Sequence, residues 1–179
     1  MKKYLFIILS ALFACALASC ASLKNRSVKN GIVGHYEYEH SWNYASPDGM
    51  GFMHCDEVGR LDFNSDGTFV DVAVQKHSHC LPDSTQSHYS MEYHCEGEWK
   101  VENGKFLFCE HSENFSLKLL NEAPAVEESD FAAEIVKQNT PDSSRWFTFD
   151  IDRLDEEWFV WSYTDKRNRK TTWDMKKME

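Results

Sequence analysis

The sequence predicts an all-β domain: an antiparallel up-and-down meander closed into a barrel of about eight or nine strands, with one short helix. Residues 89–101 alternate apolar and polar side chains, as in a strand with one buried and one solvated face. Short apolar runs recur along the chain, separated by hairpin-type turns such as Asn-Ser-Asp-Gly at 64–67. A single segment near residues 130–138 has the apolar spacing of a helix. A β-sandwich is the competing architecture.

The first twenty residues combine a basic start, an apolar run and small residues before a cysteine. The apolar run, residues 4–16, is too short to span a bilayer and is typical of a secretory signal. The segment Leu-Ala-Ser-Cys at 17–20 resembles the lipobox of bacterial lipoproteins. The resemblance implies that residues 1–19 are a signal peptide and that Cys20 is the lipidated first residue of the mature chain.

The composition of the remaining chain limits which classes of partner it can bind. Small polar residues predict that 20–31 are a lipidated cysteine and flexible tether, and residues 32–179 suffice for one β domain with its own core. Residues 1–19 hold two of the 19 basic residues and none of the 29 acidic ones, so the mature net charge is −12. This charge disfavours nucleic acid and anionic head groups, which leaves the lipid on Cys20 as the expected membrane contact.

Each expected strand is a short β-rich run that ends at a turn. The runs 60–63 and 68–74 flank the Asn-Ser-Asp-Gly turn, and Asn103-Gly104 turns the 89–101 strand into the next one. In chain order, the expected strands include residues 36–38, 60–63, 68–74, 89–101, 105–109, 115–120, 147–152, 158–163 and 171–175.

A short helix is expected at about residues 130–138, with Ser129 as its cap. Phe131 and Ile135 would share its apolar face. The strand at 158–163 is apolar on both faces, so both faces need cover. We therefore expect the barrel core to cover one face of this strand and the helix to cover its outer face.

The order of these features resembles the small lipocalin-like lipoproteins of Gram-negative envelopes. The resemblance rests on an opening Gly-x-Tyr (Gly34, Tyr36), on LDFNSDGTF at 61–69 and on GEWKV at 97–101, and it covers roughly residues 31–177. It implies a lipocalin-like barrel. These motifs specify turns and core positions, so no functional residue is carried over from that family.

Four cysteines remain in the mature domain: Cys55, Cys80, Cys95 and Cys109. An even number in an oxidising compartment predicts two disulfides, for which three connectivities are possible. The pairs Cys55–Cys80 and Cys95–Cys109 are preferred because each pair brackets one predicted hairpin.

Histidine precedes cysteine three times, at 54–55, 79–80 and 94–95, and His77 lies nearby. Both side chains are ligands for zinc or copper. Strand alternation, however, directs each histidine and its adjacent cysteine to opposite faces. We therefore expect core cysteines, surface histidines and no strong metal site. The weaker alternative is a surface metal site formed by His77, His79 and His94.

Aromatic residues are dense in the last third of the chain, and a lipocalin-like cavity could use them to hold a ligand. The candidate ligand-binding residues are Tyr93, Trp99, Phe149 and Trp161. A filled core is the competing interpretation, because small barrels fill their interiors with side chains. No nucleophile or phosphate-binding motif is present, so neither an enzyme nor a bound cofactor is expected.

These observations predict a membrane-anchored envelope lipoprotein that binds a small apolar or amphipathic molecule. The alternative is a protein-interaction or envelope-assembly module whose barrel is filled. Ala21 follows Cys20 in place of the aspartate associated with inner-membrane retention, which favours the outer membrane. The basic character of residues 21–30 favours its periplasmic side over the cell surface.

Overall fold

Nine antiparallel strands form one sheet in the part of the chain that the computed structural model describes, residues 25–81, 86–120 and 126–179. The sheet order is β3-β2-β1-β9-β8-β7-β5-β4-β6, and pairing of β3 with β4 closes eight of the strands into a barrel. The predicted barrel is confirmed. The strands are β1 (Gly34–Ala45), β2 (Phe52–Phe63), β3 (Thr68–Cys80), β4 (Gln86–Glu102), β5 (Lys105–Glu110), β6 (Ser116–Leu119), β7 (Phe147–Leu154), β8 (Trp158–Thr164) and β9 (Lys170–Lys177).

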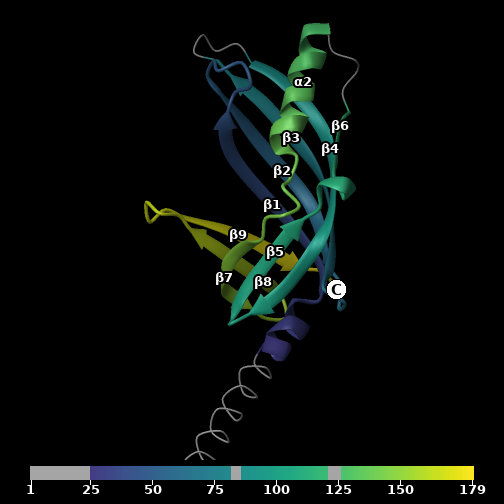
Figure 1. Cartoon of the computed structure of the whole chain (residues 1–179), viewed down its shortest axis with the longest axis vertical. Coiled ribbons are helices and arrows are strands. Elements are labelled where there is room, and N and C mark those ends of the chain that lie inside the picture. Colours follow the sequence, from purple (N-terminus) through teal and green to yellow (C-terminus); the bar gives the residue numbers. More distant parts are fainter. Residues whose placement is uncertain (1–24, 82–85, 121–125) are drawn as a thin grey trace, which may run out of the picture.

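The barrel is uneven in height because its strands differ in length. Figure 1 shows the long strands β1–β4 running along the molecule, while β5 and β7–β9 enclose only one end. β4 serves both parts, since its residues 97–102 pair with β5 and its residues 91–94 pair with the extra strand β6. The upper half of the long strands therefore needs another element to cover its inner face.

The predicted hairpin turns have the expected backbone geometry. Gly67 has φ +98° and the amide of Asn64 donates to the Thr68 carbonyl over 2.9 Å, which closes the β2–β3 turn. Asn103 and Gly104 both have positive φ, at +52° and +74°. That is the conformation of a two-residue type I′ hairpin and explains the Asn-Gly sequence between β4 and β5.

Aromatic rings fill the closed end of the barrel. The Phe63 ring is central, and its centroid lies 5.4–6.4 Å from those of Tyr36, Phe69, Trp99, Phe106, Phe159 and Trp161. Most of these pairs are edge-to-face, the arrangement that the ring quadrupoles favour. Trp99 is 2% exposed and its indole N–H donates to the Thr68 carbonyl over 2.9 Å. This aromatic plug forms one end of the hydrophobic core, which continues to Ile135 of α2.

Residues 25–32 are helical, in contrast to the flexible tether expected up to residue 31. Val28 and Ile32 are one helical turn apart and both face the barrel, where Ile32 is fully buried. The Tyr36 hydroxyl donates to the Ile32 carbonyl over 2.7 Å, and the Lys29 ammonium lies 5.5 Å from the Trp99 ring centroid. The helix thus caps the plugged end. The signal peptide and Cys20 lie outside the described residues.

The predicted helix is present as α2 (Val126–Asn139), but its expected location was wrong. Phe131 stacks on the rings of His79 and Tyr89, with centroids 5.0 and 5.6 Å apart, so α2 covers the inner face of β3 and β4. The reason is the unequal strand length, which leaves this inner face without an opposing sheet. The outer face of β8 instead carries Trp158, which is partly exposed beside the guanidinium of Arg153.

Candidate ligand-binding cavity

A half-enclosed cavity of about 570 Å³ lies inside the barrel, between the aromatic plug and α2. Its volume is within the range of small-molecule sites. Its wall is mainly aromatic, with a few polar groups at its base. The lining residues are Tyr38, His40, Trp42, Glu57, Leu61, Asp71, Gln75, Tyr93, Phe108, Glu110, Asn139, Arg145, Trp146, Phe147, Thr148, Phe149, Trp161, Tyr163, Trp173 and Met175.

Three carboxyl groups from three strands meet tyrosine hydroxyls at the base of the cavity. The Tyr38 hydroxyl lies 2.8 Å from Asp71 Oδ1 and 3.0 Å from Glu57 Oε1. The Tyr93 hydroxyl donates to Glu110 Oε1 over 3.0 Å. These five residues, which we call the acidic base, lie on β1 to β5, and regular strand alternation directs all of them inward.

The hydrogen bonds of the acidic base are too few to balance three ionised carboxyls. Burial raises the pKa of Glu57, Asp71 and Glu110 above their ordinary values, and the Glu57 and Glu110 charges raise the pKa of Asp71 further. A phenol has one proton, so Tyr38 can donate to only one of its two carboxyl neighbours at a time. The second contact is a hydrogen bond only when that carboxyl is itself protonated. When all three carboxyls are ionised, the hydrogen bonds of the acidic base cannot compensate their charge, and a cation is needed to do so.

Gly59 allows Tyr38 to reach both carboxyls. A Cβ atom at Gly59 would lie 2.7 Å from both Cζ and Oη of Tyr38, and 2.7 Å from the Ala73 methyl group. These distances are too short for any real Cβ contact, so only glycine leaves room for the phenol ring to cross β2. A small residue in the middle of β2 therefore positions the hydroxyl that joins Glu57 to Asp71.

A second polar chain extends from Glu57 towards α2. Gln75 Nε2 donates to Glu57 Oε1 over 3.2 Å, and the Gln75 carbonyl oxygen accepts from His77 Nε2 over 2.9 Å. His77 Nδ1 accepts from the Tyr44 hydroxyl over 2.8 Å. Tyr44 in turn is hydrogen-bonded to Asn139 at the end of α2. Both nitrogens of His77 are thus satisfied in the neutral ring, and burial lowers its pKa to about 4.

The mouth of the cavity lies where β1 and β9 separate. These strands pair only between residues 36–38 and 175–177, and beyond that point His40 stacks against Trp42 and lies 5.5 Å from the Trp173 ring centroid. The gap in the ladder is therefore lined by aromatic rings. Backbone pairing holds the rest of the barrel closed.

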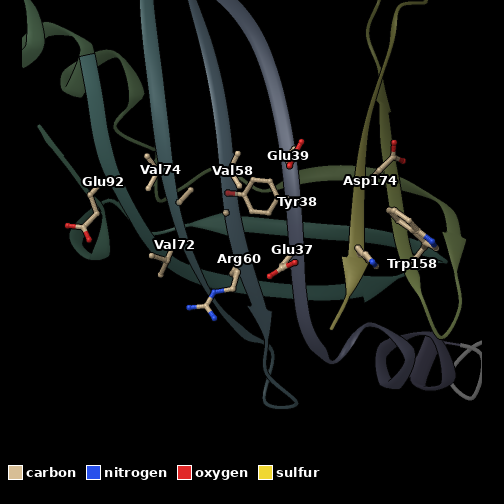
Figure 2. A pocket seen from close by; sticks show the side chains of 13 residues that line it. Glu37, Tyr38, Glu39, Val58, Arg60, Val72, Val74, Glu92, Trp158 and Asp174 are labelled. Carbon is tan, nitrogen blue, oxygen red and sulfur yellow. The ribbon is translucent and has the colours of Figure 1, made fainter. Parts of the chain in front are cut away.

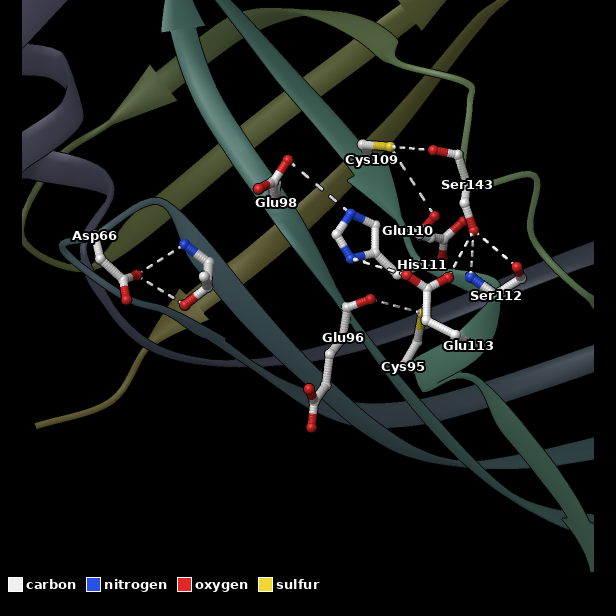
Figure 3. A network of polar contacts seen from close by, with 11 residues as sticks. Asp66, Cys95, Glu96, Glu98, Cys109, Glu110, His111, Ser112, Glu113 and Ser143 are labelled. Atoms are coloured by element: carbon white, nitrogen blue, oxygen red, sulfur yellow. Dashed lines mark hydrogen bonds and ion pairs between the residues drawn. The ribbon is translucent and has the colours of Figure 1, made fainter.

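The loop before β7 forms another side of the mouth. Figure 3 shows Ser143 tied to the chain that follows β5: its hydroxyl accepts from the Ser112 amide over 2.7 Å and donates to Glu113 over 3.1 Å. Its carbonyl accepts from the Cys109 thiol over 3.4 Å. These contacts hold the loop so that Arg145 and Trp146 reach the cavity.

Basic side chains compensate the acidic base poorly. Arg145 is the one lysine or arginine in the described lining, and its guanidinium lies 4.4 Å from the Phe147 ring centroid. Within the described ranges, Glu57, Asp71 and Glu110 form no ion pair with a lysine, arginine or histidine. Burial also lowers the pKa of His40, the histidine at the mouth, so this ring favours its neutral form.

Three of the four predicted ligand-binding residues line this cavity: Tyr93, Phe149 and Trp161. Trp99 belongs to the plug instead, because its position on β4 lies beyond the cavity, towards the β2–β3 turn. The interior is therefore neither wholly filled nor wholly hollow. Rings close one end and a cavity occupies the middle.

The predicted disulfides are absent, since Cys55, Cys80, Cys95 and Cys109 are all free thiols. The strand register explains why the pairing was wrong. Cys55 lies opposite His77, three residues before Cys80, and Cys109 lies opposite Glu98, three residues after Cys95. An odd offset places the two members of each pair on opposite faces of the sheet.

The histidines do not come together as a metal site. His77 and His79 are buried inside the barrel, whereas His94 lies on the outer face beside Glu96, 3.3 Å from its carboxylate. The expectation that His79 faces outward was wrong, because it is Cys80 that faces outward at the end of β3. In the described part of the chain, no group of three or more His, Cys, Asp or Glu residues could hold a metal ion.

Sequence reasoning missed Glu57, Asp71 and Gln75, although the sequence contains a signal for them. Along β3 the valines at 70, 72 and 74 alternate with Asp71, Ala73 and Gln75, and the set that contains Asp71 and Gln75 faces inward. Val58 on β2 likewise faces outward, 57% exposed, beside inward Glu57. Reversed alternation of this kind marks a barrel with a polar interior.

The outward-facing valines line a second, open hollow. Figure 2 shows Val58, Val72 and Val74 on the outside of the sheet, with Glu92 at one side and Trp158 at the other. Its volume is about 720 Å³, larger than that of the inner cavity, but it lies on the barrel surface. It reaches the buried Tyr38 beside Gly59, but its lining carboxyls are all exposed, unlike Asp71, so the inner cavity is the better-formed site.

No family model and no curated protein matches this chain. The resemblance to lipocalin-like envelope lipoproteins therefore stays a prediction from sequence motifs. Within the described ranges, no helix has the length and apolar character needed to cross a membrane.

Proposed function

We propose that this chain is a lipid-anchored envelope protein whose barrel binds a small amphipathic molecule. The supporting observation is the half-enclosed cavity of about 570 Å³, with ten Phe, Tyr and Trp side chains and a few convergent polar groups. Binding sites for small molecules have this composition: apolar walls supply contact area and a few polar groups fix orientation. The lipid anchor is proposed from the lipobox at residues 17–20.

Native mass spectrometry of the protein purified from its own envelope tests this function. We expect an additional mass that is lost on unfolding. Asn139→Trp adds a ring to the cavity wall at the end of α2 and should reduce the bound fraction. Gln138→Trp, at the adjacent exposed position, is the control and should retain the ligand. A wild-type protein without ligand, indistinguishable from Asn139→Trp, would contradict the proposal.

A second candidate function is protein interaction through the outer hollow. The observation that favours it is the exposure of three neighbouring valines, Val58 at 57%, Val72 at 42% and Val74 at 43%. Contiguous apolar surface on a folded protein marks interaction sites. The double variant Val58→Ser/Val74→Ser should then lose a partner that co-purifies with the wild type, while a ligand in the inner cavity stays bound.

A further inference from the structure

We infer that the cavity takes an organic cation: a protonated amine or quaternary ammonium group on an apolar body, with its charge at the acidic base. This inference rests on the proposed function and specifies the class of ligand. It is carried by three features of the cavity: its uncompensated carboxyls, its aromatic wall and its volume.

The first feature is a set of buried carboxyls that have no cationic partner among the described residues. Asp71 is 9% exposed, lines the cavity and has no basic partner among the described residues. An ionised carboxylate is costly to bury unless a positive charge accompanies it. A ligand ammonium at this position would supply that charge and would leave the single Tyr38 proton for one carboxyl neighbour. When its carboxyls are ionised, the site therefore lacks a compensating positive charge.

The second feature is the aromatic wall next to that charge. Tyr93 contributes both its ring to the wall and its hydroxyl to Glu110. Ring faces attract organic cations, while they offer no lone pairs that could replace the water around a small inorganic ion. The combination of carboxyls and rings favours a cation whose charge is attached to, or shielded by, carbon.

The third feature is room for an apolar body between the acidic base and the mouth. The cavity continues from Tyr93 past Phe149 and Trp161 to Trp173 at the gap between β1 and β9. Arg145 lies at the mouth, where it would repel a second positive charge. The preferred ligand accordingly has one cationic end, which enters first, and an apolar remainder.

Three probes of the same shape test the inference: 4-phenylbutylamine, 4-phenylbutanol and 4-phenylbutanoate. Their binding to the full mature protein in nanodiscs of zwitterionic lipid is measured by calorimetry near pH 7.5, with empty nanodiscs as reference. We expect the amine to bind at least tenfold more tightly than the alcohol, and the carboxylate to bind most weakly. Asp71→Asn and Glu57→Gln should each reduce amine affinity at least tenfold and change alcohol affinity less than twofold.

Glu92→Gln is the matched control, because it removes one negative charge from the outer face of β4 and should leave all three affinities unchanged. Equal affinity for the three probes would overturn the cation inference and leave the proposed function standing. Preference for the carboxylate would also overturn it and would indicate that Arg145 selects the ligand. If no probe binds and no ligand co-purifies, the proposed function itself fails.

Discussion

His77 illustrates how one residue links the interior of the barrel to solvent pH. It is fully buried, and its two ring nitrogens are bonded to Gln75 and Tyr44 in the neutral form. A charged ring at this position would lose its hydration, which is why burial lowers its pKa from 6.5 to about 4. The unfolded chain therefore binds a proton at a higher pH than the folded chain does.

Acidification should consequently weaken the contribution of His77 to stability. That contribution is complete above about pH 6.5 and is lost as the pH falls towards 4, with about 1–2 kcal/mol lost between pH 7 and pH 5. The raised pKa values of Glu57, Asp71 and Glu110 act in the opposite direction, since their folded forms retain protons more strongly. The measurement is therefore the difference in urea-unfolding free energy between wild type and His77→Asn at both pH values.

We expect the difference between wild type and His77→Asn to be smaller at pH 5 than at pH 7 by about 1–2 kcal/mol. Val72→Ala, on the outer face of β3 and without a titratable group, is the control and should show no such change. A wild-type-minus-variant difference that is constant between the two pH values would contradict the assignment of His77 as a buried neutral group.

The free thiols lead to a second residue-scale prediction. Cys55, Cys95 and Cys109 are at most 2% exposed, whereas Cys80 is partly exposed. Burial also raises the pKa of Cys95 to about 12, which leaves little thiolate to react. A disulfide-exchange reagent should therefore label Cys80 first in the native protein and all four after denaturation. Peptide mapping that finds a Cys55–Cys80 link would contradict the strand register.

At the scale of elements, α2 replaces the strands that are missing from the upper half of the barrel. Its residue Ile135 is fully buried, and Phe131 stacks between rings of β3 and β4. The helix also carries Asn139, which contacts Tyr44 and lines the cavity. It therefore serves both as part of the core and as part of the binding site.

Phe131→Asp should destabilise the fold, because it removes an apolar contact and places a charge beside His79 and Tyr89. The expected cost is roughly 1.5–3 kcal/mol of unfolding free energy, from the transfer of one large apolar side chain. Urea denaturation should show a lower midpoint than for the wild type. Asp130→Asn, at the neighbouring exposed position, should unfold at the wild-type midpoint.

Strands were predictable from the sequence where their inward-facing side chains are apolar. Where polar residues or glycine face inward, the ends of the strand could not be predicted. β4 shows regular alternation from Tyr89, which predicted it well. β2 was expected only from Arg60 but begins at Phe52, because its inward positions include Glu57 and Gly59 and so break the apolar pattern. The position of α2 depends on the relative lengths of distant strands, which no local pattern encodes.

At the scale of the whole molecule, meander order and hairpin turns predicted the closed barrel, whereas the cavity emerged only from the structure. Aromatic content alone fits a plug as well as a cavity, and here it forms both. Phe63 and Trp99 fill one end while Phe149 and Trp161 line the space beside them. The acidic base was missed because charged residues inside a barrel contradict the usual apolar interior.

Lipid attachment leads to a prediction for the whole chain. Cys20→Ala should move the protein from the detergent phase to the aqueous phase in a phase-partitioning assay, because two or more acyl chains are lost. Cys80→Ala is the matched control and should partition as the wild type does. A Cys20→Ala protein with a normally cleaved signal that still partitions into detergent would refute lipid anchoring.

The helix at residues 25–32 sets which way the barrel would face on a membrane. It sits on the plugged end, at the opposite end from α2 in Figure 1, and Cys20 precedes it by only a few residues in the sequence. With a lipid on Cys20, the plug would point to the bilayer and the aromatic mouth near Trp173 would open to the aqueous side. Ligand exchange would then proceed with dissolved molecules or with a docked donor protein, and extraction directly from the anchoring leaflet would be disfavoured.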